Sequence, residues 1–280
     1  MVFDCSFGLG YLPVLWSFFT IAALAVSYIM AVMENHVYPF LPSISATGSN
    51  IPESNIFSLL MNVSIILAAS NYFTRYFQCQ HQARHCGENR ELIYRYNQFS
   101  LVVSIVSLGG ALLVANIQAR KEFYLLEVHD AGAVIFFTFT SIYFWLQTYI
   151  SFKTALYGLY SSWLCHLRFF LTFCLSLCSG VYFVTAAISS YSFRKHHQYY
   201  NSLANLQPGD EGYTLHVVSN ASEWLAFLII MGSSLTFFDE FQQVIMLIDC
   251  QEKSPTIISY DGIGEYEEMK LNLYDDEAKR

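Results

Sequence analysis

Charged residues are scarce in this chain of 280 residues: only 13% are Asp, Glu, Lys or Arg, whereas a soluble domain carries about 25%. Basic residues are the rarer kind, with 14 Lys and Arg against 22 Asp and Glu, so the chain has no basic footprint for nucleic acid. Hydrophobic residues make up 54% and aromatic residues 17%. This composition excludes a disordered chain, a collagen and a disulfide-stapled secreted module, and it predicts a polytopic membrane protein.

Six stretches are long and apolar enough to cross a bilayer, which takes about 20 residues of helix. They lie at about 11–33, 55–77, 97–117, 131–151, 167–190 and 217–238. Helix is the expected conformation because lipid offers no partner to free backbone groups. We therefore predict an all-α bundle of six transmembrane helices over residues 1–245.

Cysteine is absent from the three loops that this arrangement places on one side, about 34–54, 118–130 and 191–216. Disulfides persist in oxidising compartments and rarely in the cytosol. Because the loops on the non-cytosolic side contain no cysteine, we expect the fold to depend on helix packing and not on a disulfide framework. Lys and Arg number 4 on the side of these loops and 10 on the other side. The positive-inside rule then places both termini in the cytosol.

The acidic residues gather at the C-terminus. Residues 239–280 hold 4 basic and 11 acidic residues, which accounts for −7 of the net charge of −8. We predict that 246–280 is a disordered, acidic cytosolic tail. Two Tyr-x-x-apolar patterns in it, Tyr260 with Ile263 and Tyr266 with Met269, are candidate sorting motifs of the kind that clathrin adaptors bind.

The first cysteine-free loop reads HVYPFLPSISATG over residues 36–48 and is followed by Pro52-Glu53. Further segments of interest are Thr74-Arg75-Tyr76, Val128-His129-Asp130-Ala131-Gly132-Ala133, Leu146-Gln147, Cys165-His166-Leu167-Arg168, Ser222-Glu223-Trp224 and Phe238-Asp239-Glu240-Phe241-Gln242. As a set these segments resemble the damage-regulated autophagy modulator (DRAM) family, within the broader Frag/DRAM/Sfk-like six-span membrane proteins. The resemblance covers about residues 11–245. Two positions depart from it: Ala46 stands where the family loop usually has Asp, and Ser43 where an aromatic is common.

The resemblance implies a lysosomal or endosomal membrane protein that promotes autophagy, is linked to cell death, and has no established catalytic activity or cofactor. The broader group also includes plasma-membrane proteins that influence phosphoinositide kinases. A plasma-membrane scaffold that modulates phosphoinositide signalling is therefore the alternative. A channel or transporter is disfavoured because the spans lack a ladder of charges or paired broken helices.

Polar residues are predicted to gather at the lumenal ends of four spans. They are Glu53, Asn62, Asn116, His129, Asp130, His216 and Glu223. Three interpretations stay open: a hydrogen-bond network that holds the helices together, a site that binds a lipid headgroup or senses pH, and a metal-dependent lipid hydrolase that uses His129, Asp130, His216 and Glu223. The hydrolase is the weakest because no HExxH-type spacing supports it, so we expect no catalytic residue and no metal.

The loop 41–57 is expected to cap the bundle as an ordered connector or to cover this polar cluster as a lid. Pro42, Gly48 and Pro52 forbid a continuous helix there. Pro52 followed by Glu53 suits the start of a helix, with the carboxylate at the positive end of the helix dipole.

On the cytosolic side, Cys79 and Cys86 flank a segment that contains His81 and His85. Their spacing does not bring the cysteines and histidines to one face of a helix, so we do not expect zinc. Juxtamembrane cysteines are candidates for S-palmitoylation. Membrane lipids are the other partners that the sequence suggests.

Overall fold

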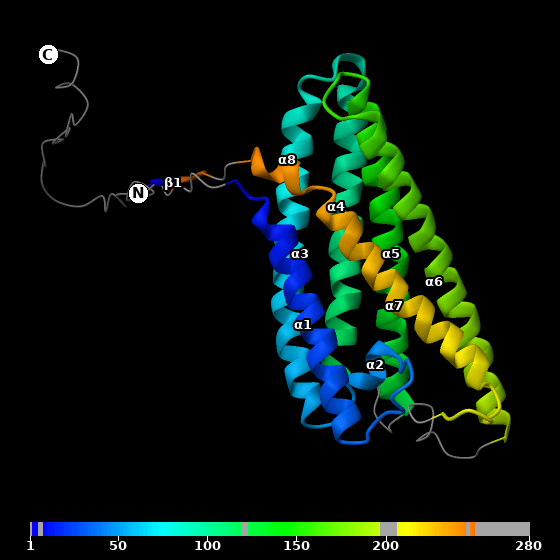
Figure 1. The fold of residues 1–280 in the computed structure, drawn as a ribbon. Coiled ribbons are helices and arrows are strands. Elements are labelled where there is room, and N and C mark those ends of the chain that lie inside the picture. Colours follow the sequence, from blue (N-terminus) through cyan, green and yellow to red (C-terminus); the bar gives the residue numbers. More distant parts are fainter. Residues whose placement is uncertain (1, 5–7, 119–122, 197–205, 245–246, 250–280) are drawn as a thin grey trace, which may run out of the picture. The chain divides into compact units, whose positions relative to one another are not determined.

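The computed structural model describes residues 2–4, 8–118, 123–196, 206–244 and 247–249 (Figure 1). Six of its helices are long and apolar enough to cross a membrane, which confirms the predicted all-α polytopic fold. They belong to α1 (Tyr11–Met33), α3 (Glu53–Ala83), α4 (Arg90–Asn116), α5 (Phe123–Ala155), α6 (Ser162–His196) and α7 (Tyr213–Leu235). Three short helices accompany them: α2 (Ile44–Thr47), η1 (Gly87–Asn89) and α8 (Phe238–Gln242).

Two short strands form a separate compact unit of the chain. β1 (Val2–Asp4) and β2 (Leu247–Asp249) pair antiparallel, with Val2 opposite Asp249. The rest of the predicted tail, including the candidate sorting residues Tyr260, Ile263, Tyr266 and Met269, lies outside the described residues.

The helices reach beyond the predicted spans at several ends. α1 has the expected bounds, but α3 has 31 residues and continues to Ala83. At 1.5 Å per residue α3 is about 46 Å long, more than the roughly 30 Å of a hydrocarbon core. Residues such as Gln78 and Gln82 form helix well but are not apolar, so a search for apolar runs stops before them. The predicted start of α3 at Glu53 is confirmed.

The six long helices form a ring in which sequence neighbours α3 to α7 pack against each other in turn, and α1 packs against α3. In Figure 1, α7 runs obliquely from the end of α6 towards the end of the bundle where α8 lies. Contact between α1 and α7 is sparse, and α2 touches both helices. The short helix and its loop therefore occupy the end of the gap between α1 and α7.

Hydroxyl pairs join several of the helices inside the bundle. Thr20 of α1 contacts Ser64 of α3 at 2.6 Å, and Ser107 of α4 contacts Thr140 of α5 at 2.6 Å. In a bilayer, lipid tails are as apolar as the helix surfaces, so such hydrogen bonds and close packing hold helices together in place of a hydrophobic driving force.

Helices α4 and α5 approach each other closely at Gly110. A Cβ atom added to Gly110 would lie 2.6 Å from the backbone nitrogen of Phe136 and 2.7 Å from the carbonyl oxygen of Gly132. Small residues allow this distance. At the neighbouring Gly109, an added Cβ would meet no atom of the described residues within 4 Å.

We therefore expect Gly110→Ala to lower the stability of the purified protein by about 1–3 kcal/mol, because backbone atoms of α5 must move away from the new methyl group. Thermal unfolding in detergent measures the change. Gly109→Ala is the matched control and should be neutral or slightly stabilising, because alanine favours helix. Equal destabilisation by both variants would contradict this account of the α4–α5 contact.

Candidate functional site

One face of α7 binds the loop that precedes α3. Glu223 and Trp224 follow Asn220 by three and four residues, so the three side chains share this face. The Asn220 amide donates to the carbonyl oxygen of Leu41 at 2.9 Å, and the Trp224 indole N–H donates to that of Pro42 at 2.9 Å. We call Asn220, Glu223 and Trp224 the loop anchor.

Glu223 makes the charged contact of the loop anchor. Its side chain is buried, and Oε2 accepts a hydrogen bond from the backbone N–H of Ile44 at 2.9 Å. This N–H lies in the first turn of α2, where the helix itself offers no acceptor. Asp130 of α5 and Tyr182 of α6 interact electrostatically with Glu223, so this carboxylate lies where α2, α5, α6 and α7 meet.

A second contact fixes the beginning of the same loop. Nδ1 of His36 lies 2.7 Å from Oε1 of Glu53. Glu53 is fully buried at the start of α3, whereas His36 is about one third exposed. The beginning of the loop between α1 and α3 is therefore attached to α3, and the middle of the loop is attached to α7. Both contacts agree with the expectation of an ordered connector.

The seven residues predicted to form one lumenal cluster are distributed over separate contacts. Asn62 and Asn116 exchange two side-chain hydrogen bonds, of 2.9 and 3.1 Å, between α3 and α4. Nδ1 of His129 lies 2.6 Å from the carbonyl oxygen of Ile117. His216 lies near the start of α7.

Of the predicted set, the structure thus brings Glu223 close to Asp130 and Asn62 to Asn116. Glu53 pairs instead with His36, which the sequence did not single out. Among the described residues, no group of three His, Cys, Asp or Glu side chains is placed to hold a metal ion.

The opposite end of the bundle contains a buried charge cluster that the sequence analysis missed. Glu240 of α8 accepts from Nη1 of Arg75 at 2.9 Å and from Nη2 of Arg168 at 2.5 Å. The two arginine side chains are 1% and 3% exposed. We call Arg75, Arg168 and Glu240 the arginine cluster; it joins α3 and α6 to α8.

The surrounding groups accept further hydrogen bonds from Nε and Nη1 of Arg75. Its Nε donates to Gln147 of α5 at 2.9 Å, and Nη1 donates to Gln78 and to Tyr160 at 2.8 Å each. Nη2 of Arg75 has no hydrogen-bond partner among the described residues. The Arg75 Cζ lies 4.6 Å from the centre of the Phe237 ring, and cation–π attraction adds to the binding of this guanidinium.

Arg168 is held in the same manner. It donates to Ser151 of α5 at 2.9 Å and to the carbonyl oxygen of Thr236 at 3.0 Å. Its Cζ lies 4.1 Å from the centre of the Phe237 ring, on which Arg75 also lies. One carboxylate and one aromatic ring therefore serve two guanidinium groups, and the cluster carries a net positive charge.

Tyr160 lies in the loop between α5 and α6, outside the spans. Its hydroxyl accepts from Arg75 and donates to Oε1 of Gln82 at 2.5 Å. Burial raises the pKa of Tyr160 above its ordinary value, so the hydroxyl keeps its proton and can fill both roles.

Arg75 and Arg168 are among the ten basic residues counted on the side of the chain termini, and the structure adds that these two side chains are buried. Arg75 lies within α3 and Arg168 within α6, and both side chains are buried. Arg75, Gln147, Arg168 and Glu240 all occur in the segments that carry the family resemblance. The signal in the sequence is that these segments contain charges of opposite sign, two arginines and a glutamate.

The two candidate palmitoylation sites are buried. Cys79 and Cys86 are both fully buried, and their sulfur atoms contact Gln147 Oε1 at 3.8 Å and the carbonyl oxygen of Gln82 at 3.3 Å. Burial raises the pKa of the Cys86 thiol, which disfavours the reactive thiolate. Acylation of either residue stays a prediction, and it requires local opening of this end of the protein.

Glu240→Gln is expected to lower the free energy of unfolding by about 3–5 kcal/mol, because it leaves two buried guanidinium groups without a carboxylate. Unfolding of the purified protein in detergent measures this loss. Asp239→Asn, a change of the same kind at the exposed neighbouring residue, should have little effect. Replacement of Arg75, Arg168 and Glu240 together by Met should recover much of the stability. Equal effects of Glu240→Gln and Asp239→Asn would contradict the role assigned to the cluster.

Comparison with known proteins confirms the family resemblance. The profile of the Frag1/DRAM/Sfk1/Cwh43P N-terminal domain matches residues 8–244. DNA damage-regulated autophagy modulator protein 1 of Homo sapiens is 33% identical over 248 residues, which are 87% of this chain and 95% of that protein. DNA damage-regulated autophagy modulator protein 2 of Bos taurus is 32% identical over 251 residues, 86% of this chain and 87% of that protein.

A more distant relative is the modulator of macroautophagy TMEM150B-A of Xenopus laevis, 29% identical over 143 residues, which cover 50% of this chain and 57% of that protein. No solved structure matches the chain. Because the profile includes all six spans, and relatives above 30% identity cover most of both chains, the protein belongs to the Frag1/DRAM/Sfk1/Cwh43P family and, within it, to the damage-regulated autophagy modulators.

Proposed function

We propose that this protein modulates autophagy from the lysosomal membrane, as a six-span protein without catalytic activity of its own. The observation that carries the proposal is the similarity, over 86% or more of the chain, to proteins named as autophagy modulators. Those names describe modulators and not enzymes, which supports a non-enzymatic role.

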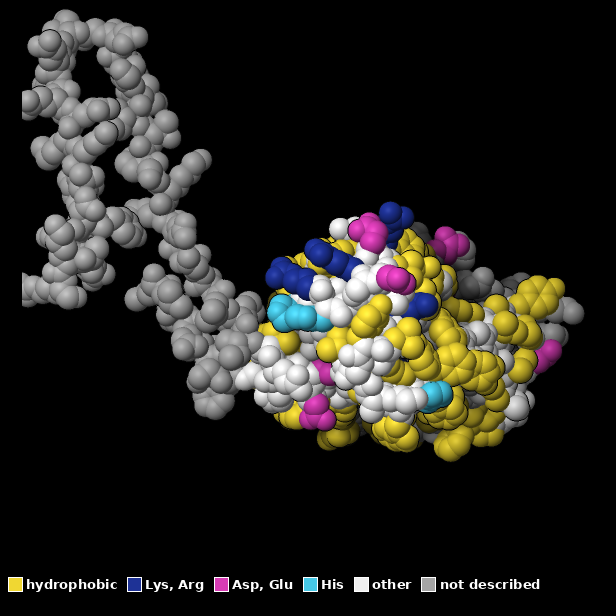
Figure 2. Space-filling model, turned by 90° about the horizontal axis from the view of Figure 1, so that it is seen from above, with side chains coloured by type: hydrophobic (Ala, Val, Ile, Leu, Met, Phe, Trp, Pro, Cys, Tyr) yellow, Lys and Arg dark blue, Asp and Glu magenta, His cyan; other side chains and the backbone are white. Residues whose placement is uncertain are grey.

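The distribution of charge supports an orientation with the α8 end in the cytosol. Figure 2 views this end of the bundle and shows Lys and Arg side chains gathered on it. Arg84, Arg90 and Arg95 are exposed where α3 is followed by α4. Cytosolic loops carry an excess of such residues. The loop between α1 and α3 then faces the lumen, and the acidic tail faces the cytosol.

In this orientation the loop anchor is the candidate lumenal sensor. Ionised Glu223 accepts the Ile44 N–H as a charge-assisted hydrogen bond, which is roughly twice as strong as a neutral one. Protonation of Glu223 in an acidifying lumen would weaken this contact. The nearby Asp130 favours that protonation while it is itself ionised, because like charges repel. Tyr182 also faces Glu223 and is uncharged throughout this range. The loop would then be held less firmly at low pH. A lipid headgroup that reaches the loop is the second ligand class for the same site.

Hydrogen exchange tests the sensor. In the wild-type protein, the peptide that contains Ile44 should lose protection between pH 7 and pH 5 after correction for intrinsic rates. Glu223→Gln should show the reduced protection at both pH values, by about tenfold in exchange rate, which corresponds to about 1.4 kcal/mol.

Glu34→Gln changes an exposed carboxyl near the beginning of the same loop and should behave as wild type. Protection that is independent of pH in the wild-type protein would exclude a pH-sensing role for Glu223 and would leave autophagy modulation itself untouched.

Cellular assays test the proposed function. Deletion of the protein should lower autophagic flux, and re-expression should restore it, while a tagged protein should colocalise with lysosomes.

Replacement of Tyr260 and Tyr266 by Ala should shift the protein to the cell surface if the tail binds clathrin adaptors. Steady residence of the wild-type protein at the plasma membrane, with normal flux after deletion, would favour the phosphoinositide scaffold. Lipid turnover by the purified protein would favour the hydrolase.

A further inference from the structure

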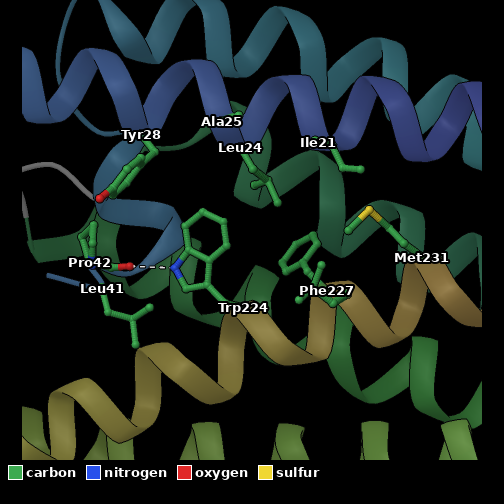
Figure 3. A pocket seen from close by; sticks show the side chains of 10 residues that line it. Ile21, Leu24, Ala25, Tyr28, Leu41, Pro42, Trp224, Phe227 and Met231 are labelled. Carbon is green, nitrogen blue, oxygen red and sulfur yellow. Dashed lines mark hydrogen bonds between the residues drawn. The ribbon is translucent and has the colours of Figure 1, made fainter. Parts of the chain in front are cut away.

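An apolar groove lies between α1 and α7, where the two helices diverge. Its volume is about 390 Å³. Figure 3 shows the side chains that line it: Ile21, Leu24 and Tyr28 from α1, and Trp224, Phe227 and Met231 from α7. Leu41 and Pro42, from the loop between α1 and α3, close one end of the groove. We propose that this groove binds an acyl chain of a bilayer phospholipid.

The groove opens to the lipid and not to water. Most of its lining residues belong to two helices that are long and apolar enough to span the membrane, α1 and α7. Ile21 and Leu228, one on each of these helices, are 51% and 57% exposed, and side chains exposed at this depth face hydrocarbon. A lipid chain can therefore enter sideways from the bilayer without crossing water.

The lining offers no free donor to a polar ligand. The Trp224 indole N–H donates to Pro42 and the Tyr28 hydroxyl donates to the carbonyl oxygen of Pro39, both at 2.9 Å. The two rings contact each other edge to face, with centroids 6.3 Å apart. Trp and Tyr are typical of the headgroup level of a membrane, so the closed end lies near the interface and the apolar remainder extends into the hydrocarbon region.

The dimensions fit a lipid chain better than a protein segment. A volume of 390 Å³ holds about a dozen methylene groups if each occupies roughly the 30 Å³ of a water molecule in the liquid. A transmembrane helix is about 10–12 Å wide with its side chains and rises 5.4 Å per turn, so a volume of 390 Å³ would hold no more than about one turn of it. A sterol would bring a hydroxyl group to a surface whose two donors already bind the loop.

A bound chain would contact both α1 and α7, which touch each other only sparsely. It would also pack against Trp224, which is part of the loop anchor. Because hydrocarbon is the solvent here, shape and dispersion contacts, and not the hydrophobic effect, provide the affinity. We therefore expect a chain in slow exchange with the bilayer and not a permanently bound cofactor.

Photo-crosslinking tests the assignment. The full-length protein is reconstituted into phosphatidylcholine vesicles that contain a phosphatidylcholine with a diazirine in the middle of one acyl chain. After illumination, the labelled peptides are mapped by mass spectrometry. We expect labels to concentrate on the facing residues of α1 and α7. Labels spread evenly over all lipid-facing helices would show only annular lipid and would overturn the proposal.

Two variants fill the groove. Ala25 is exposed and lines the groove, so Ala25→Trp places a large ring inside it without displacing a buried side chain. Leu228→Trp does the same from α7. Each should reduce labelling of the groove peptides at least fivefold. Val26→Trp is the matched control, because Val26 is the neighbouring exposed residue and does not line the groove.

Labelling of Ala25→Trp and Leu228→Trp at the level of Val26→Trp would overturn the proposal. Two further outcomes would do so as well: stronger labelling of the groove by a diazirine sterol than by the phospholipid, and elution of the wild-type protein as a dimer that Ala25→Trp and Leu228→Trp abolish. Monodisperse elution and an unchanged melting temperature establish that each variant is folded.

Discussion

The bundle depends on one buried carboxylate that two arginines share. Glu240 accepts from Arg75 and Arg168, and these three residues come from three helices that are far apart in the sequence. Removing Glu240 would leave two buried guanidinium groups without a counter-charge near the membrane, where charges are costly. This requirement holds α8 against the parts of α3 and α6 that carry the two arginines, and with it the end of α7. The Phe237 ring, which contacts both guanidinium groups, stabilises the same arrangement without adding a negative charge.

α7 therefore has polar contacts towards both ends and apolar ones between them. Towards one end the loop anchor binds the backbone of residues 41–44, and at the other end α8 places Glu240 between the arginines. Between these two sets of contacts, α7 faces α1 across the apolar groove. A helix so fixed can respond to its surroundings mainly where its contacts are weakest, at the groove and at the single carboxylate contact of Glu223. The candidate sites for pH and for lipid therefore adjoin each other on α7, because Glu223 is followed directly by Trp224, which lines the groove.

The sequence predicted the parts of the structure that depend on local patterns. Apolar runs identify the six spans, and α1 has the predicted bounds because it is apolar from end to end. The start of α3 at Glu53 follows from the proline before it. The shared face of Asn220 and Glu223 follows from helical spacing. Their partners could not be predicted, because they are backbone atoms of a loop almost 180 residues earlier, and no pattern of side chains records which carbonyl a distant amide will reach.

The arginine cluster escaped prediction for a related reason. Taken singly, Arg75 and Arg168 resemble ordinary positive charges at the cytosolic ends of spans, and Glu240 resembles the first residues of an acidic tail. The three become a site only when the ring of helices brings α3, α6 and α8 together. The rule that polar groups in a bilayer must find partners says that a carboxylate is needed close to two such arginines. Glu240 is the acidic residue that the chain supplies at that end of α7 with its side chain turned inwards, whereas its neighbour Asp239 is exposed. Applied to opposite charges at the ends of spans, and not only to charges within them, the same rule would have named Glu240 as a candidate partner of these arginines, but only the fold shows that it binds both.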